Sequence, residues 1–250
     1  MVLTLSCFAG CTSTASDSDL AYIQQKGKLV VGITDYAPMD YKDENGEWTG
    51  FDAELARLFA QELGVECEFF IIADWSKKVF ELDSKNIDVI WNGMTIDDEL
   101  LKTTSCSDPY VVNAQVLVMK ADQLAAYPDA ASIKDLSIAV ENGSAGEKAA
   151  KALGCTNLVV VQDQAAALLE VKSGTSQVCV VDITAARAMT GEGTSYPDLG
   201  VGFSLTSENY GIGFRKGSDV TAKLNAFLAE LKTNGQLQAL ATKYELTLAE

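Results

Sequence analysis

Hydrophobic positions along the chain follow two patterns: short β-branched runs, and longer stretches in which apolar residues recur three and four apart. Residues 28–34, KLVVGIT, follow the first pattern and predict a strand. Residues 51–64, FDAELARLFAQELG, follow the second and predict a helix. Asp52 is well placed to cap this helix, and Gly64 is well placed to end it. The apolar stripe of the helix comprises Leu55, Leu58, Phe59 and Leu63.

Strands and helices alternate through the rest of the first half of the chain. Strands are predicted at 65–72 and 86–91, with a short helical piece at 79–82 between them. Strand–helix–strand order of this kind implies a parallel sheet with right-handed crossovers.

The same order of elements is repeated in the second half. The second unit comprises strands at 136–140, 158–161 and 177–182 and helices at 144–154 and 164–174. Residues 115–134, between the units, have the turn residues of a connection, and a strand at 210–218 with two helices closes the chain. Two α/β units imply two lobes, and a small ligand is expected in the crevice between them.

Composition and charge narrow the choice of partners. The chain has 250 residues, 48% of them hydrophobic, which suits one large domain or two of ordinary size. With 19 Lys and Arg against 35 Asp and Glu, the formal charge is −16. Such a surface repels phosphate backbones and anionic lipid headgroups, so we expect no nucleic-acid partner. The negative charge is interpreted first as a source of solubility. Salt screens distant surface charges, so the preference of the surface for cationic ligands is only weak.

Cysteine usage does not indicate a metal site. The six cysteines form no CxxC pair, and the chain has no histidine to complete a zinc set, so we expect no metal and no cofactor. Buried free thiols are the first expectation for the last four of them, although export would permit a disulfide. These four are Cys67, Cys106, Cys155 and Cys179.

The N-terminal segment resembles the tail of a bacterial lipoprotein signal. In MVLTLSCFAGCTSTASDSDL, FAGC would be the lipobox and Cys11 the lipidated residue, followed by a Ser/Thr/Asp tether. A full signal begins with a basic region and a longer apolar segment, so we interpret residues 1–26 as a truncated signal and tether. A disordered leftover is the alternative. No later apolar run approaches the roughly 20 residues that span a bilayer.

Several motifs together resemble one protein family. DYKDENGEWTGFDAELARLFAQELG, NIDVIWNGMTI, SDPY, ENGSAGE and YGIGFRKGS occur in the order and spacing of the polar-amino-acid-type solute-binding proteins of bacterial ABC importers. The resemblance runs from about Gly27 to Leu246. It implies the periplasmic-binding-protein type II fold, an α/β fold with two lobes, each a mainly parallel sheet flanked by helices. Lobe 1 would comprise residues 27–111 and 207–250, and lobe 2 residues 112–206. Such lobes close by hinge bending.

The resemblance also implies how an amino acid would be held. An aspartate at the end of a lobe-two strand and a carbonyl in the GMT loop take the ligand's ammonium in this family, and Asp182 and Gly93 match them. Thr95 of the same loop and Ser144 of the loop before a helix match positions that help to bind the carboxylate. Asp182 and Ser144 can also serve as caps of the helices that follow them.

The resemblance breaks down at the main carboxylate-binding position. An arginine five residues beyond Thr95 usually grips the carboxylate, and this chain has Leu100 there and Ala145 in place of a second hydroxyl. A charge-assisted hydrogen bond contributes about 1.5–3 kcal/mol, so an unreplaced arginine would weaken binding roughly tenfold to a hundredfold or more. Three explanations stay open. Another basic group, Arg187 or Lys102, reaches the site; the ligand is an amine without a carboxylate; or N–H groups at a helix start suffice.

Aromatic and acidic residues after the first strands are further candidates. Tyr36 and Trp75 match family positions whose rings enclose the ligand's side chain, and an aromatic face also suits a cation. Asp35 either contacts a cationic ligand or caps a turn. Trp91 ends a buried strand and is expected in the core.

Three functions are compatible with these features. The leading hypothesis is an extracytoplasmic lipoprotein on the outer face of the cell membrane or in the periplasm. It would act as a monomer, capture an amino acid or related amine, and deliver it to the membrane subunits of an ABC permease. The second is a dehydratase-like enzyme on the same scaffold. Without histidine its acid–base chemistry would fall on Asp35, Asp182 or a lysine, so we expect no enzyme. The third is a ligand-sensing module that acts through a separate receptor.

Overall fold

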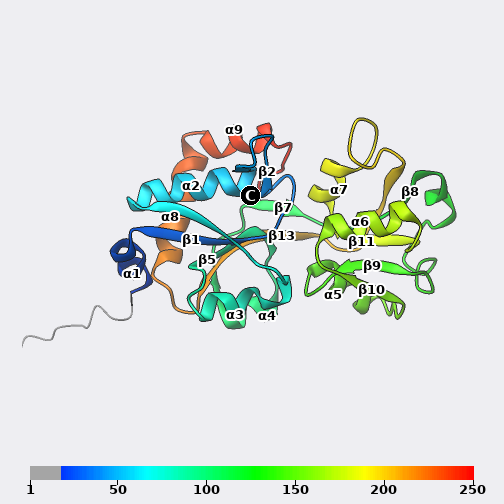
Figure 1. Cartoon of the computed structure of the whole chain (residues 1–250), viewed down its shortest axis with the longest axis horizontal. Helices are drawn as coiled ribbons and strands as arrows, with labels where there is room; N and C mark the ends of the chain where they lie inside the picture. Colours follow the sequence, from blue (N-terminus) through cyan, green and yellow to red (C-terminus); the bar gives the residue numbers. More distant parts are fainter. Residues whose placement is uncertain (1–17) are drawn as a thin grey trace, which may run out of the picture.

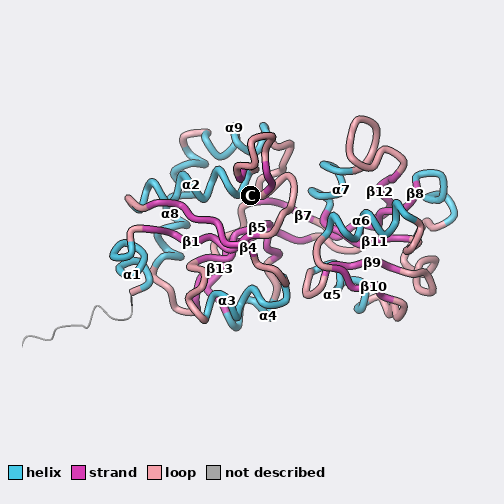
Figure 2. The backbone as a smooth tube through the Cα atoms, in the orientation of Figure 1, coloured by secondary structure: helices cyan, strands magenta, loops and turns pink. Residues whose placement is uncertain are grey.

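The computed structural model describes residues 18–250 and shows two lobes side by side along the long axis of the molecule (Figure 1). Helices lie on the outside of both lobes, and the strands run through their middle (Figure 2). The two-lobed α/β fold predicted from the sequence is confirmed.

Lobe 1 is built on a mixed sheet with the strand order β4-β1-β5-β13-β6, to which β7 adds by pairing with β13. Its strands are β1 (Lys28–Ile33), β4 (Glu66–Ile71), β5 (Val89–Thr95), β6 (Thr104–Cys106), β7 (Val111–Asn113) and β13 (Glu208–Arg215). A small hairpin joins β2 (Tyr41–Lys42) to β3 (Trp48–Thr49). The helices are α1 (Asp19–Lys26), α2 (Phe51–Leu63), η1 (Trp75–Lys77), α3 (Lys78–Asp83), α4 (Asp98–Thr103), α8 (Val220–Thr233) and α9 (Gln236–Lys243).

Lobe 2 has a five-stranded sheet in the order β10-β9-β11-β8-β12. Its strands are β8 (Gln115–Lys120), β9 (Ile138–Glu141), β10 (Leu158–Val161), β11 (Val178–Asp182) and β12 (Leu199–Ser204). The helices are η2 (Ala121–Ala126), α5 (Ala145–Ala152), α6 (Gln164–Ser173) and α7 (Ile183–Met189). β9 pairs in parallel with β10 and β11, as strand–helix–strand order predicts.

Each sheet also has an antiparallel part. β13 is antiparallel to β5, β6 and β7, and β8 is antiparallel to β11 and β12. β8 begins the stretch 115–134 that we expected to be a connection. Its residues 115–119 are fully enclosed within the sheet, which explains the continuous apolar run VLVM.

The chain passes between the lobes twice. The first passage lies at Ala114, between β7 and β8, and the second at 205–207, between β12 and β13. Val112 and Asn113 pair with β13 in the lobe 1 sheet, so the change of lobe falls after them rather than at residue 112. Short extended connections of this kind can act as hinges.

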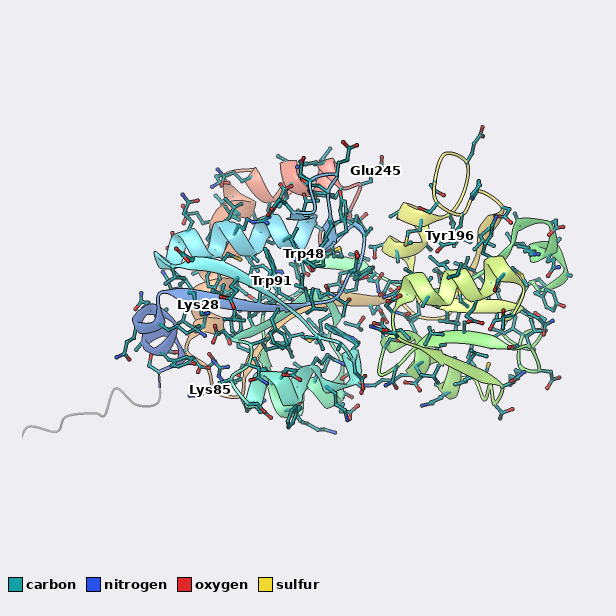
Figure 3. All side chains as sticks on the ribbon, in the orientation of Figure 1. Lys28, Trp48, Lys85, Trp91, Tyr196 and Glu245 are labelled. Carbon is teal, nitrogen blue, oxygen red and sulfur yellow. The ribbon has the colours of Figure 1, made fainter. Side chains whose placement is uncertain are left out.

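The core of lobe 1 lies between α2 and the sheet. Leu55, Phe59 and Leu63 of the predicted stripe are buried, whereas Leu58 is 40% exposed. Trp91 of β5 is fully buried, as predicted, with its ring centroid 6.1 Å from that of Phe59 (Figure 3). α2 ends at Gly64 in the left-handed conformation, as predicted.

Residues 18–26 differ from the expected tether, because they form a helix docked on lobe 1. Ser18 caps α1 by accepting a hydrogen bond from the Ala21 N–H, and Asp19 forms an ion pair with Arg215, Nε to Oδ1 2.9 Å. Ile23 is completely buried in the lobe 1 core. The helix lies at the end of lobe 1 farthest from lobe 2 (Figure 1). Cys11 and the proposed lipobox lie outside the described residues.

Substituting Ile23→Ala tests this docking. Removing a fully buried isoleucine side chain leaves a cavity, so we expect the free energy of unfolding to fall by about 3 kcal/mol. Urea denaturation of the variant and of the matched Gln24→Ala variant, at an exposed position of the same helix, would measure the difference. Equal stability of the two variants would show that residues 18–26 are a tether after all.

Candidate functional site

A cavity lies between the lobes, where the carboxyl ends of β5, β9 and β11 meet. Polar and charged side chains make up much of its wall, and part of it is open to solvent. Six of the predicted site residues line it: Tyr36, Trp75, Gly93, Thr95, Ser144 and Asp182. Leu100 and Ala145, the two departures from the family pattern, also line it.

Three predicted candidates lie elsewhere. Arg187 is exposed on α7 and lines a separate hollow with Lys243 and Tyr244, because the phase of α7 turns it away from the cavity. Lys102 in the last turn of α4 is exposed and does not line the cavity, and neither does the exposed Asp35. None of the three therefore supplies a charge to the cavity wall.

Asp182 is the acidic centre of the site. It ends β11, is 5% exposed, and accepts hydrogen bonds from the side-chain amides of Asn113, Gln115 and Gln164. No described residue forms an ion pair with it, and it does not cap α7 with its side chain. Burial, reinforced by the charge of Glu208, raises the pKa of Asp182 to about 6. A ligand ammonium would supply the missing positive charge.

Glu208 extends this acidic centre toward the hinge. Its Oε1 accepts hydrogen bonds of 2.7 Å from the Thr95 hydroxyl and from the Asn113 and Gln115 side-chain amides. Asn113 and Gln115 flank the first passage between the lobes, and Glu208 follows the second. The acidic centre and both hinge strands therefore share one hydrogen-bond network.

The two predicted aromatic residues form part of the wall. Tyr36 is 6% exposed, and its hydroxyl lies 2.6 Å from both the Thr184 hydroxyl of lobe 2 and the Tyr210 hydroxyl of lobe 1. Trp75 is 7% exposed at the start of η1. One edge of the Tyr36 side chain is therefore fixed by contacts to both lobes.

Residues 93–95, expected to form a loop, are the end of β5 and are held by an aspartate that we expected to cap α2. Gly50, not Asp52, is the N-cap, and the buried Asp52 accepts hydrogen bonds from the Gly93 N–H, at 2.7 Å, and from the Tyr110 hydroxyl. Burial raises the pKa of Asp52 to about 7. Gly93 has φ +55°, and an added Cβ would lie 2.7 Å from the Tyr36 ring, so only glycine fits here.

Two lysines that the sequence reasoning missed also line the cavity. Lys78, the first residue of α3, is 8% exposed, and its Nζ donates to the carbonyls of Trp75 and Gly143. Lys148 of α5 reaches from lobe 2 to Asp97 and Glu99 of lobe 1, with N–O distances of 2.7 Å. Lys77 and Lys78 are adjacent in DWSKK, so the sequence could not show which one turns inward.

Glu141 is a second carboxyl group that sequence reasoning missed. It ends β9, as Asp182 ends β11, and it lines the cavity at 5% exposed. Burial, with the charges of Asp182 and Asp163, raises the pKa of Glu141 to about 8. The family pattern identified Asp182, at the end of a strand; the same position after the predicted strand LSIAV is held by Glu141, to which the pattern assigned no role.

Lobe-to-lobe contacts close the cavity on this side. Besides Lys148, the Asn142 side chain donates to Asp74 at 3.0 Å. Gly143, with φ +70°, lies so close to lobe 1 that an added Cβ would be 2.7 Å from the Ser76 Cα. The structure therefore shows the two lobes in contact across the mouth of the cavity.

Residues 29–247 match the family described as bacterial extracellular solute-binding proteins, family 3. The chain belongs to this family. Its relatives include the L-cystine-binding protein TcyJ of Escherichia coli K12, which is 28% identical over 97% of this chain and 92% of the relative. The arginine-binding extracellular protein ArtP of Bacillus subtilis 168 is 30% identical over 98% of this chain and 96% of the relative.

Solved structures agree with the family assignment of this solute-binding protein. A mutant of ArgBP from T. maritima superimposes with a TM-score of 0.84 and 33% identity, covering 90% of this chain and 98% of that chain. AncCDT-1, titled an ancestral amino acid-binding protein and a precursor of cyclohexadienyl dehydratase, has a TM-score of 0.83 and 31% identity, covering 91% and 99%. The type II fold implied by the sequence motifs is thereby confirmed.

Three further observations concern residues 18–250. No group of three or more Cys, Asp or Glu side chains in this range is arranged to hold a metal ion. Within the same range no helix is both long and apolar enough to cross a bilayer. The four cysteines described are free: Cys155 and Cys179 are buried, and Cys67 and Cys106 are half-buried.

Proposed function

We propose that this solute-binding protein captures an amino acid between its lobes and delivers it to the membrane subunits of an ABC importer. The observation that carries the proposal is the buried Asp182, a carboxyl group without a cation partner among the described residues, which lines the cavity between the lobes. Relatives that bind L-cystine and arginine by name support an amino acid as the ligand class.

The cavity wall carries groups of both charges, as the binding of a zwitterion requires. Asp182 and the end of β5 at Gly93 would hold the ammonium, with Tyr36 and Trp75 beside the side chain. Lys78 and the start of α5 at Ser144 are candidates for the carboxylate. Ligand contacts to both lobes would favour the closed arrangement, because a ligand shifts a conformational equilibrium by its differential affinity for the two states.

We further propose that the protein is extracytoplasmic, monomeric and anchored by a lipid on Cys11. The family's description as extracellular supports the location. α1 lies at the end of lobe 1 away from lobe 2, so an anchor before it would leave the cavity unobstructed (Figure 1). Incorporation of labelled palmitate into the whole protein, and its loss in Cys11→Ala, would test the anchor.

The ligand class is tested by thermal shift with matched pairs that differ in the carboxylate: L-arginine and agmatine, L-lysine and cadaverine, L-cystine and cystamine. A ligand at a hundred times its dissociation constant stabilises the folded state by about 2.7 kcal/mol, so we expect at least one amino acid to raise the melting temperature by several degrees. The remaining amino acids complete the panel. A panel in which no amino acid stabilises the protein would overturn the proposal, and turnover of a bound compound would indicate an enzyme.

A further inference from the structure

Lys78 is placed in the cavity wall beside the lobe-two loop that precedes α5. Its Nζ lies 3.2 Å from the carbonyl oxygen of Gly143 in lobe 2 and 3.3 Å from that of Trp75 in lobe 1. It also lies 4.8 Å from the centroid of the Trp75 ring. The ammonium is therefore held at the point where the two lobes meet, with only 8% of the residue exposed.

Lys78 differs from the other cavity lysine in its partners. Lys148 is neutralised by Asp97 and Glu99, each at 2.7 Å, whereas no carboxylate within residues 18–250 forms an ion pair with Lys78. Glu141 of the same cavity favours the charge of Lys78 without forming an ion pair with it, and burial, reinforced by the charge of Lys148, lowers the pKa of Lys78 to about 8. Carbonyl oxygens satisfy hydrogen bonds of an ammonium but do not neutralise it, so the buried charge is costly. An anionic group of a bound ligand would remove this cost.

The surroundings of Lys78 define where that anion would sit. Leu100, at the family's arginine position, packs with Trp75 in one apolar cluster and supplies no charge. Gly143, whose carbonyl accepts from Lys78, and Ser144 lead into the eight-residue helix α5, and Ser144 and Ala145 line the cavity. Lys78 from lobe 1 and the start of α5 from lobe 2 thus lie next to each other in the cavity wall.

We propose that Lys78 binds the carboxylate of the amino-acid ligand, replacing from α3 the arginine that is missing at Leu100. The inference rests on the proposed function. A single ammonium gives point-charge recognition without the bidentate geometry of a guanidinium, so this site tolerates more variation in the orientation of the carboxylate.

The test compares two changes that remove the same contact: Lys78→Met in the protein, and loss of the carboxylate in the ligand. Dissociation constants are measured calorimetrically for whichever amino acid of the panel binds and for its decarboxylated partner, for example L-arginine and agmatine. We expect Lys78→Met to raise the dissociation constant of the amino acid by about tenfold to a hundredfold. The dissociation constant of the amine should change by less than about twofold. Lys78→Arg should retain most of the affinity for the amino acid.

Two other lysines provide controls. Lys102→Met, at an exposed position outside the cavity, should change neither affinity. Lys148→Met should lower the affinity for the amino acid and for the amine equally, because the substitution removes lobe-to-lobe ion pairs rather than a ligand contact. If Lys78→Met does not fold by circular dichroism, Lys78→Gln is the second neutral variant.

The outcomes separate this inference from the function on which it rests. Unchanged affinity of Lys78→Met for an amino acid that binds the wild type overturns the role of Lys78 and leaves the proposed function standing. An equal loss of affinity for the amino acid and for the amine also overturns the role of Lys78 in carboxylate binding, because Lys78 would then support only the structure of the site. If the wild type binds no amino acid, both proposals fail.

Discussion

Asp182→Asn is expected to weaken binding of the amino-acid ligand by about tenfold to a hundredfold. The substitution keeps the shape of the side chain but removes one negative charge that the ammonium would meet, a contact of about 1.5–3 kcal/mol, while the carboxyl groups of Glu208 and Glu141 stay nearby. Asn113 and Gln115 donate to one oxygen of Asp182 and Gln164 donates to the other, so the introduced NH2 group would face at least one donor from which it cannot accept. Calorimetric titration of both proteins at pH 7.5 measures the loss.

The same carboxyl group predicts a pH dependence of affinity. The pKa of Asp182 is about 6 without ligand, so the carboxyl group must lose a proton before it can bind an ammonium at lower pH. We expect affinity to fall by about tenfold per pH unit below 6, and this slope should be absent in Asp182→Asn. Asp35→Asn, an exposed aspartate outside the cavity, is the matched control and should leave affinity and slope unchanged. A slope that persists in Asp182→Asn would assign the titration to another group.

Glu141→Gln is expected to stabilise the ligand-free protein at alkaline pH by up to about 5 kcal/mol. Burial raises the pKa of Glu141 from 4.5 to about 8, so the carboxyl group favours the folded state while it is protonated. That contribution is fully present below about pH 4.5 and is lost as the pH rises through 8, at 1.36 kcal/mol per pKa unit. Glutamine cannot ionise, so the variant does not suffer this loss.

Urea denaturation at pH 4.5 and at pH 8.5 measures the effect of Glu141→Gln. The groups that face Glu141 also influence its ionisation: Asp182 and Asp163 disfavour the charge, and Lys78 favours it. Because the wild type and the variant share these groups, the difference between the two proteins isolates Glu141. We expect equal midpoints at pH 4.5 and a higher midpoint for the variant at pH 8.5. A variant that is less stable at pH 8.5 would show that the ionised Glu141 is compensated in the fold.

Much of the site was predictable because it lies at the ends of strands. A parallel strand with a buried run of apolar residues is readable from the sequence, and its carboxyl end is where ligands bind in open α/β sheets. The family motifs assigned ligand contacts to Asp182, Gly93 and Tyr36, which lie at or near such strand ends, and all three line the cavity. Glu141 ends β9 in the same way but was missed, because the family pattern assigned it no role.

The charged groups on helices were not predictable, because helix phase decides which side of the molecule they face. Arg187 on α7 turns to the outside, whereas Lys78 on α3 turns inward although Lys77 beside it is exposed. Each residue advances a helix by about 100°, so a shift of one residue would turn Lys77 rather than Lys78 toward the cavity. No local sequence pattern fixes this helix phase. Similarly, Lys148 contributes to the cavity only because lobe 2 meets the acids of α4 in lobe 1.

The sequence by itself determined the two α/β units, the family and the acidic end of the site, because local periodicity and short motifs encode them. Tertiary structure alone decided which cations face the cavity, that residues 18–26 dock as a helix, and that β8 lies inside the lobe 2 sheet. These features depend on contacts between residues far apart in the chain, such as Asp19 with Arg215 and Lys148 with Asp97. The burial of these side chains and the pairing of their charges depend on the folded arrangement of the two lobes.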